Sequence, residues 1–459
     1  MLAAFRGWAI LTLLLHLLAY RLPEELFWSV WPFSRWPFWF ASVLVVLAGL
    51  LIIPQCNRKI QIALVQFWQS IPGKQHPQSW FIAMALLSLP IFWLARIRHL
   101  GWGDANILVV GLSHPQQTVI YNWQAPLTVY LHQRLWALVG YPYWGWGVET
   151  VYAMVSVLCG GGFVYLLLKL ALDLGRDTLE RVLIVGFVLT SGAMQLFFGY
   201  VENYTLISLL SLIFLWLGIR VMAGTVPLWG AILTLAIANA CHPSTMVLWP
   251  AGLYLAWRRY RQGGSGSLIT LSLLLPLLIV ANSVLTLMEL GDHGLVAFLG
   301  DDRPGGGDHI WFVPLLATRT KWERYTMFSG DHLIEWVNEH FLISTFGLVA
   351  ILVVAIWLWQ TRHQRLPLKA TVGHQLWFLG LASAGYLSLT WVWNADYGIR
   401  KDWDLFAPSA FVYSLFAALL LGRFMSDRDS LAQTTLIIVV VSALHTSAWV
   451  FVNTQPLFL

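Results

Sequence analysis

Polar residues with catalytic potential lie where apolar segments of this chain meet short loops. Asp104 follows an apolar run and the tripeptide Gly101-Trp102-Gly103, whose glycines permit a sharp turn. A carboxylate in such a position can accept the proton of an attacking hydroxyl, which is general-base chemistry. The alternative role is a helix N-cap, because Asp is common immediately before a helix. The two roles are compatible.

Two other turns carry polar residues next to apolar segments. Glu202 lies in an aromatic-rich turn with Tyr200 and Tyr204, and His242 precedes Pro243 at a later turn. If the intervening segments cross a membrane, these turns reach the same level as Asp104. We therefore predict that Glu202 and His242 bind ligand hydroxyls, with ordinary polar turns as the alternative.

A helix with a polar face is expected over residues 331–340. His332, Glu335 and Glu339 are spaced by three and four residues, which places them on one side of a helix. His332 and Glu335 are the candidates for a divalent metal such as Mg²⁺ or Mn²⁺, although no HExxH motif is present. A solvated polar face is the favoured interpretation, so no cofactor is assigned.

The composition indicates an integral membrane protein. Of the 459 residues, 58% are hydrophobic and only 11% are charged, against about 25% charged in ordinary soluble domains. This excludes a disordered chain, a fibrous protein and a soluble enzyme. The three cysteines indicate neither a disulfide framework nor a metal motif. A net charge of +5 without long basic clusters argues against nucleic acid as a partner.

The apolar segments predict an all-α polytopic fold with about thirteen transmembrane helices, because roughly 20 apolar residues span a bilayer. The predicted spans are residues 5–20, 37–54, 80–97, 147–171, 182–199, 204–222, 226–241, 244–257, 268–288, 341–359, 375–393, 406–422 and 431–451. The apolar stretch 126–139 is expected to lie at the membrane interface or to begin another span. His16 and His445 fall inside spans, where we expect neutral rings bonded to a neighbouring helix.

The distribution of charge predicts the orientation in the membrane. With the N-terminus in the cytoplasm, 16 of the 27 Lys and Arg residues fall on the inner side, as the positive-inside rule requires. Of the 22 acidic residues, 17 fall on the outer side, which is therefore expected to carry the polar chemistry. The long polar stretches 98–125, 289–340 and 394–405 are all outer in this arrangement.

The order of features over roughly residues 80–220 resembles the GT-C superfamily of membrane glycosyltransferases. Those proteins have an acidic outer loop, a short juxtamembrane helix, a Pro-Leu motif, a long span and a basic inner loop. The matching positions here are Asp104, residues 105–112, Pro126-Leu127 with Tyr130, Val139-Gly140, residues 147–171, and Arg176 with Arg181. The chain departs from the pattern at Ala105, where many members have a second acid, and at Ala125, where many have a second proline.

The resemblance implies an inverting glycosyltransferase, similar to the mannosyl- and aminoarabinosyltransferases, that uses a polyprenyl-phosphate-linked sugar. Asp104 would be the base, and the outer residues Arg303, Lys321, Arg400 and Lys401 would meet the donor phosphate unless they pair with nearby acids. Trp123 and Gln124, beside the Pro-Leu motif, join Glu202 and His242 as candidates for binding sugar or acceptor. The acceptor is a lipid, a glycan or a protein.

The resemblance also implies a division of the chain. Residues 1–79 would be two additional N-terminal helices and an inner loop, and 80–288 the GT-C-like core with its first outer loop at 98–125. Residues 289–340 would form a long outer loop that closes as a lid or serves as a linker. Residues 341–459 would be the C-terminal helices with the outer loop 394–405.

Two other functions are compatible with the sequence. One is a non-catalytic GT-C-like scaffold subunit of a membrane complex, and the other is a transporter of lipids or solutes. A transporter is expected to carry charges inside its spans, and few are present here. The expected location is the inner membrane of a bacterial cell, with the active side facing the periplasm and with membrane lipids and a lipid-linked sugar as partners.

Overall fold

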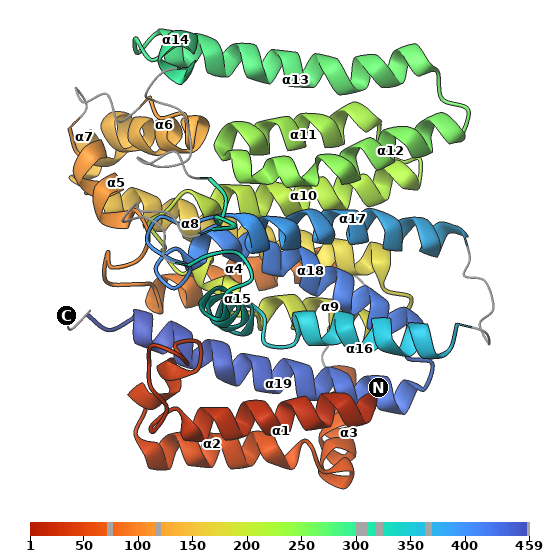
Figure 1. Cartoon of the computed structure of the whole chain (residues 1–459). Helices are drawn as coiled ribbons and strands as arrows, with labels where there is room; N and C mark the ends of the chain where they lie inside the picture. Colours follow the sequence, from red (N-terminus) through yellow and green to blue (C-terminus); the bar gives the residue numbers. More distant parts are fainter. Residues whose placement is uncertain (71–76, 115–120, 300–310, 317–324, 363–369, 457–459) are drawn as a thin grey trace.

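The chain folds into a bundle of helices (Figure 1). The computed structural model describes residues 1–70, 77–114, 121–299, 311–316, 325–362 and 370–456. Within these residues, the only β-type pairing is an isolated bridge between Phe312 and Trp393. The all-α prediction is therefore confirmed.

The helices of the described residues follow one another in the order in which Figure 1 labels them. The α-helices are α1 (Leu2–Leu18), α2 (Phe38–Leu50), α3 (Pro54–Ser70), α4 (Pro77–Leu94), α5 (Ala105–Leu112), α6 (Pro126–Leu135), α7 (Tyr141–Trp144), α8 (Val148–Leu174), α9 (Thr178–Leu189), α10 (Tyr204–Met222), α11 (Leu228–Cys241), α12 (Trp249–Arg261), α13 (Gly266–Glu289), α14 (Leu295–Leu299), α15 (Gly330–Ile343), α16 (Gly347–Gln360), α17 (Ala370–Val392), α18 (Trp403–Phe424) and α19 (Arg428–Asn453). Short helices of other types are η1 (Trp31–Arg35), η3 (Trp136–Gly140), η4 (Gly192–Phe197) and η5 (Pro243–Leu248).

Several of these helices have the length and composition of membrane spans. Among the described residues, six helices are long and apolar enough to cross a bilayer, or eight if each of two bent pairs counts as one span. Two shorter apolar helices, α1 and α11, accompany them. The chain is thus an integral membrane protein, as its composition predicts.

The number of full-length spans is smaller than the thirteen expected, although every predicted segment contains a helix. The segment predicted at 182–199 is divided between α9 and η4, and the one at 244–257 begins as η5 and continues as α12. Near residue 345 the chain bends by 101° between α15 and α16, so the span expected from residue 341 begins only at Gly347. These breaks leave helices shorter than the roughly 20 residues that a simple crossing needs.

Burial distinguishes the centre of the bundle from its lipid-facing surface. The apolar window of α18 is 94% buried, whereas those of α4 and α13 are each 6% buried. Leu271, Leu274 and Leu278 are among the large apolar side chains that α13 exposes. Extended apolar surface of this kind is rare on soluble monomers, and it suits contact with lipid chains.

Charged residues tie several helices together at one end of the bundle. The buried Glu180 of α9 pairs with the buried Arg423 of α18 at 2.6 Å and also with Arg176. Nearby, Arg58 of α3 pairs with Asp429 of α19 at 2.6 Å. All of these lie in segments predicted to be cytoplasmic, and they lie at the end opposite α5, α6 and α7 (Figure 1).

The N-terminal helices pack against the C-terminal helix. His16 on α1 and His445 on α19 lie within hydrogen-bonding distance, at 2.9 Å between Nε2 and Nδ1, and the His16 ring stacks on Phe33. The prediction that each intramembrane histidine bonds to a neighbouring helix is confirmed. Around the core, the loops that carry Asp104, Glu202 and His242 all emerge at the end where α5, α6 and α7 lie.

Candidate active site

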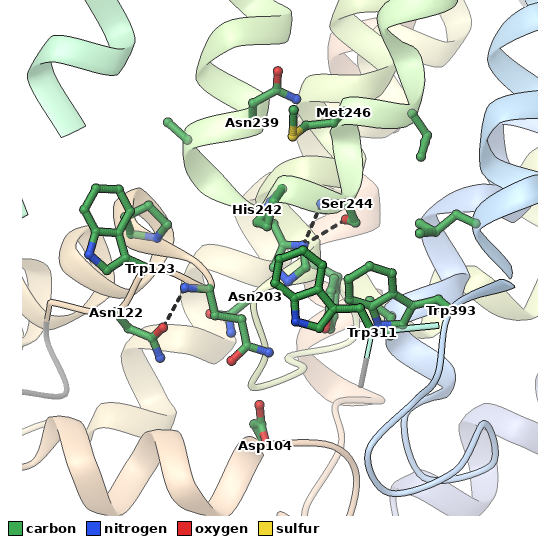
Figure 2. A pocket seen from close by; sticks show the side chains of 18 of the residues that line it. Asp104, Asn122, Trp123, Asn203, Asn239, His242, Ser244, Met246, Trp311 and Trp393 are labelled. Atoms are coloured by element: carbon green, nitrogen blue, oxygen red, sulfur yellow. Dashed lines mark hydrogen bonds between the residues drawn. The ribbon is translucent and has the colours of Figure 1, made fainter. Parts of the chain in front are cut away.

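A cavity of about 1010 Å³ opens at the end of the bundle where α5 and α6 lie. Its polar end is formed by the loops before α5, before α10 and before α18, and by the turn between α11 and η5. Apolar side chains of α11, α13 and α17 form a large part of the remaining lining. Figure 2 shows Asp104 at one end, Asn122 and Trp123 on one side, and Trp311 and Trp393 on the other.

The polar end of the cavity is strongly acidic. Among the described residues that line it are five carboxylates and no Lys or Arg; the carboxylates are Asp104, Glu202, Asp396, Asp402 and Asp404. Two of these carboxylates, those of Glu202 and Asp404, lie close to Gly103. A Cβ placed on Gly103 would lie 2.7 Å from Glu202 Oε1 and 2.9 Å from Asp404 Oδ2.

The backbone of Gly103 explains how the turn brings these groups together. Its φ of +51° lies in the left-handed region, which glycine adopts without steric cost. Its N–H donates to the Lys401 carbonyl at 2.9 Å, which links the turn to the loop before α18. The sharp turn predicted from the glycines around Trp102 is therefore present. Because Gly103 has no side chain, there is room beside it for two carboxylates.

Asp104 occupies the N-cap position of α5 without using its side chain as a cap. The carboxylate instead lines the cavity and is hydrogen-bonded by the Tyr397 hydroxyl. Burial raises the pKa of Asp104 above its ordinary value, and the hydrogen bond from Tyr397 partly opposes that increase. A carboxylate with a raised pKa is better suited to general-base chemistry near neutral pH than an ordinary exposed one.

Glu202 holds the Asp104 loop in place. Its side chain is 3% exposed, and its carboxylate accepts hydrogen bonds from the backbone N–H groups of Asp104 and Asn203. Burial raises the pKa of Glu202 well above its ordinary value, and the negative charges of Asp404 and Asp104 raise it further. Glu202 therefore lies in the predicted site, and its contacts also give it a positioning role.

His242 lines the cavity, and its two ring nitrogens have different surroundings. Its Nδ1 accepts a hydrogen bond from the Ser244 backbone N–H at 3.2 Å and lies 2.8 Å from the Ser244 hydroxyl (Figure 2). An accepting Nδ1 leaves the proton of a neutral ring on Nε2, and Nε2 has no hydrogen-bond partner among the described residues. Burial lowers the pKa of His242 to about 3, so the ring is a neutral donor.

Trp123 and Gln124, the predicted contacts of sugar or acceptor, also line the cavity. The Trp123 indole N–H donates to the His293 carbonyl at 2.8 Å, and its ring packs against Phe298. Trp123 can therefore offer a ligand only its ring. The Gln124 backbone N–H is held by Asn122 Oδ1 at 2.7 Å (Figure 2), which fixes the start of α6 at Pro126.

Of the predicted phosphate-binding cations, the two that the structure describes, Arg400 and Lys401, are not gathered with these residues. Arg400 forms an ion pair with Glu24 and lies near the Trp31 ring, while Lys401 is exposed, and neither lines the cavity. Arg303 and Lys321 lie outside the described residues. Pairing with an acid was the alternative expected for these cations, and Arg400 adopts it.

The expected helix over 331–340 is present as α15, but two of the three residues of its expected polar face are buried, and the third, Glu335, is half-buried. His332 and Glu339 are both 0% exposed, because the helix packs inward. The His332 ring stacks between Tyr325 and Trp391. Within the described part of the chain, no group of three His, Cys, Asp or Glu side chains is arranged to hold a metal ion, so we assign no step to one.

Asp404 was not predicted to be a site residue. It is 1% exposed, in the first turn of α18, and it faces the cavity. Its signal in the sequence was an acid at the very start of an apolar run, the same signal that identified Asp104. Tyr397, in the same loop, had no such signal.

Comparisons with known proteins do not assign a family. No protein-family model matches the chain, and no curated protein sequence matches it. A solved structure to which it is similar is that of ArnT from Cupriavidus metallidurans bound to undecaprenyl phosphate. The TM-score is 0.49, with 11% identity over 82% of this chain and 77% of that one. A likeness at this level assigns neither a family nor a reaction, so function is inferred from the cavity itself.

Proposed function

We propose that this chain is an inverting glycosyltransferase of the GT-C type that transfers a sugar from a polyprenyl-phosphate donor to a hydroxyl of a lipid, glycan or protein. The observation that supports this most strongly is one cavity with a buried acidic end and apolar walls among membrane helices. The order of motifs from Asp104 to Arg181 supports the same proposal. The active side would face away from the cytoplasm.

The two ends of the cavity suit the two parts of a lipid-linked sugar. The acidic end offers carboxylate, amide and imidazole groups of the kind that bind sugar hydroxyls. The apolar end is lined by side chains such as Ala236, Val280 and Val392, and α13 on its outer side is almost entirely lipid-exposed. A polyprenyl chain can therefore leave the cavity along α13 without crossing a polar barrier.

Asp104 is the proposed base. The acceptor hydroxyl transfers its proton to the Asp104 carboxylate as its oxygen attacks the anomeric carbon. The bond between that carbon and the donor phosphate oxygen breaks, and polyprenyl phosphate leaves with the bonding electron pair. Attack from the face opposite the leaving group inverts the configuration at the sugar.

The other site residues take supporting roles in this proposal. Glu202 fixes the backbone of Asp104, and Tyr397 orients its carboxylate. The neutral His242 ring lines the cavity and remains a candidate for binding a sugar hydroxyl. Arg303 and Lys321 remain predicted contacts of the donor phosphate.

The raised pKa of Asp104 predicts how transfer depends on pH. Transfer requires the ionised carboxylate, so kcat/KM should fall tenfold per pH unit below the pKa and level off above it. Because burial raises that pKa, the fall should begin at a higher pH than for an ordinary Asp, whose pKa is about 3.9. Tyr397→Phe removes a hydrogen bond that lowers this pKa, so it should shift the midpoint to still higher pH. A profile with the same midpoint in both proteins would contradict this role of Tyr397.

The apolar part of the cavity can be tested separately from the acidic end. Ala281 on α13 lines it, and Ala281→Trp should fill it. Transfer from a long-chain polyprenyl-phosphate sugar should then fall by about tenfold or more, because loss of even a few buried methylenes costs about 0.8 kcal/mol each. Transfer from a short-chain analogue of the same donor should fall much less.

Leu278→Trp is the matched control, because Leu278 lies on α13, is 62% exposed and does not line the cavity. It should leave transfer from both donors near the wild-type rate. Equal loss from long and short donors in Ala281→Trp, with Leu278→Trp unaffected, would exclude this wall as the binding site of the lipid chain.

A further inference from the structure

A second cavity lies apart from the candidate active site. It has a volume of about 790 Å³, lies between α2, α4, α9 and α19, and shares no lining residue with the first cavity. Of these helices, α2 and α19 lie in the half of the bundle that holds both termini (Figure 1). Five of the residues that line it are aromatic, namely Trp36, Trp39, Phe40, Phe198 and Phe451.

This groove opens towards the lipid-facing surface and offers little to a polar ligand. Trp39 is 70% exposed and Ile91 is 59% exposed, so one side of the groove is uncovered. The lining contains four hydroxyl groups, of which the three on threonines donate to backbone carbonyls and the fourth is that of Ser447. Thr454 donates to the Phe451 carbonyl at 2.7 Å. Thr446 donates to the Thr190 carbonyl at 2.7 Å, and Thr190 donates to the Gly186 carbonyl at 2.8 Å. An apolar chain is the ligand that this lining fits.

Three arginines adjoin residues that line one end of the groove. Arg35 precedes Trp36, and Arg96 follows Ala95 with its Cβ packed against Gly199, beside Phe198. The Arg98 backbone N–H donates to the Asn453 carbonyl at 3.0 Å, between Phe451 and Thr454 in sequence. All three therefore lie at the same end of the bundle as the start of α2 and the end of α19.

None of these arginines is neutralised by an acid in the described part of the chain. Arg35 lies over the Trp31 ring at 4.4 Å, and Arg96 lies over the Trp93 ring at 4.4 Å. Arg96 also donates to the Trp93 carbonyl at 3.0 Å. At this end of the bundle, Glu24 pairs with Arg400 instead. The positive charge beside the groove thus remains available to an anion.

We propose that this groove binds an anionic phospholipid of the surrounding bilayer. An acyl chain would lie along the aromatic lining, and the phosphate would be bound by the arginines beside it. Guanidinium groups form bidentate hydrogen bonds with phosphate oxygens, and basic pockets between membrane helices bind anionic headgroups. Because α2 forms one wall and α4, α9 and α19 the others, the lipid would join the N-terminal helices to the core.

The test uses the full-length purified protein and its melting temperature in detergent with added lipid. Phosphatidylglycerol should raise the melting temperature more than phosphatidylcholine with the same acyl chains, because only the bound lipid stabilises the native state. The double variant Arg96→Gln/Arg98→Gln should lose the difference between the two lipids. Arg259→Gln/Arg261→Gln, which alters two exposed arginines at the opposite end of the bundle, should keep it.

A second variant tests the groove rather than the charge. Ala95→Trp places a large side chain in the lining, so it should reduce stabilisation by both lipids. Equal stabilisation of the wild type by the two lipids would overturn the proposal, as would a preference for phosphatidylglycerol that survives both Arg96→Gln/Arg98→Gln and Ala95→Trp. Displacement of bound phosphatidylglycerol by polyprenyl phosphate, measured by native mass spectrometry, would also overturn it, because the groove would then be a donor site.

Discussion

Asp104→Asn is expected to lower kcat for glycosyl transfer by about 10²–10⁴-fold, which is the usual contribution of a general base. The substitution keeps the size and shape of the side chain and removes only its ability to take a proton. The fold should be unaffected, because the Asp104 side chain makes no capping hydrogen bond with α5. Steady-state transfer from a saturating polyprenyl-phosphate donor measures the loss.

Asp331→Asn provides the matched control. Asp331 is an exposed residue in the first turn of α15 and does not line the cavity, so transfer should be unchanged. If Asp104→Asn retains wild-type kcat, the base lies elsewhere, and Glu202→Gln and Asp404→Asn become the next variants to compare.

Gly103→Ala is expected to lower kcat/KM by about 10²-fold, the effect of displacing a catalytic group by about 1 Å. The new methyl group would lie 2.7 Å from Glu202 Oε1 and 2.9 Å from Asp404 Oδ2, closer than a Cβ can approach. Either the Asp104 loop or the two carboxylates must move. Gly103 also has a left-handed backbone conformation, which would lower the stability of the alanine variant by about 1–2 kcal/mol.

Gly145→Ala separates the effect of crowding the carboxylates from the effect of backbone strain. Gly145 has a φ of +63°, similar to that of Gly103, but a Cβ added to it would have no neighbouring atom within 4 Å. This variant should lose about 1 kcal/mol of stability and keep its transfer activity. Equal loss of transfer in the two variants would mean that backbone strain, and not crowding of the carboxylates, explains the effect of Gly103→Ala.

Much of the fold follows from the pattern of apolar residues. The span predicted at 204–222 coincides with α10, and the one predicted at 268–288 lies within α13. The breaks within 182–199 and 244–257 fall at Ser191-Gly192 and just before Pro250. Such residues do not by themselves predict a break, because the continuous helix α13 also contains a proline, Pro276. The bend between α15 and α16 falls inside a segment that contains no proline.

The candidate site was partly predictable for a simple physical reason. Polar residues at the ends of successive apolar helices must gather at one level of the membrane, and Asp104, Glu202 and His242 do line one cavity. Pairing across long sequence separations leaves no such pattern. The choice of the distant Glu24 as the partner of Arg400 therefore became apparent only from the folded chain. The same is true of the approach of Asp404 to Gly103.

The central claim is tested most directly by sugar transfer itself. Purified wild-type protein would receive a panel of radiolabelled polyprenyl-phosphate sugars, with a membrane extract as the source of acceptors, and labelled product would be counted after chromatography. The account predicts transfer from at least one donor, with inverted configuration at the anomeric carbon. Absence of transfer across the panel, from protein with a cooperative thermal transition, would contradict it and favour a scaffold or a transporter.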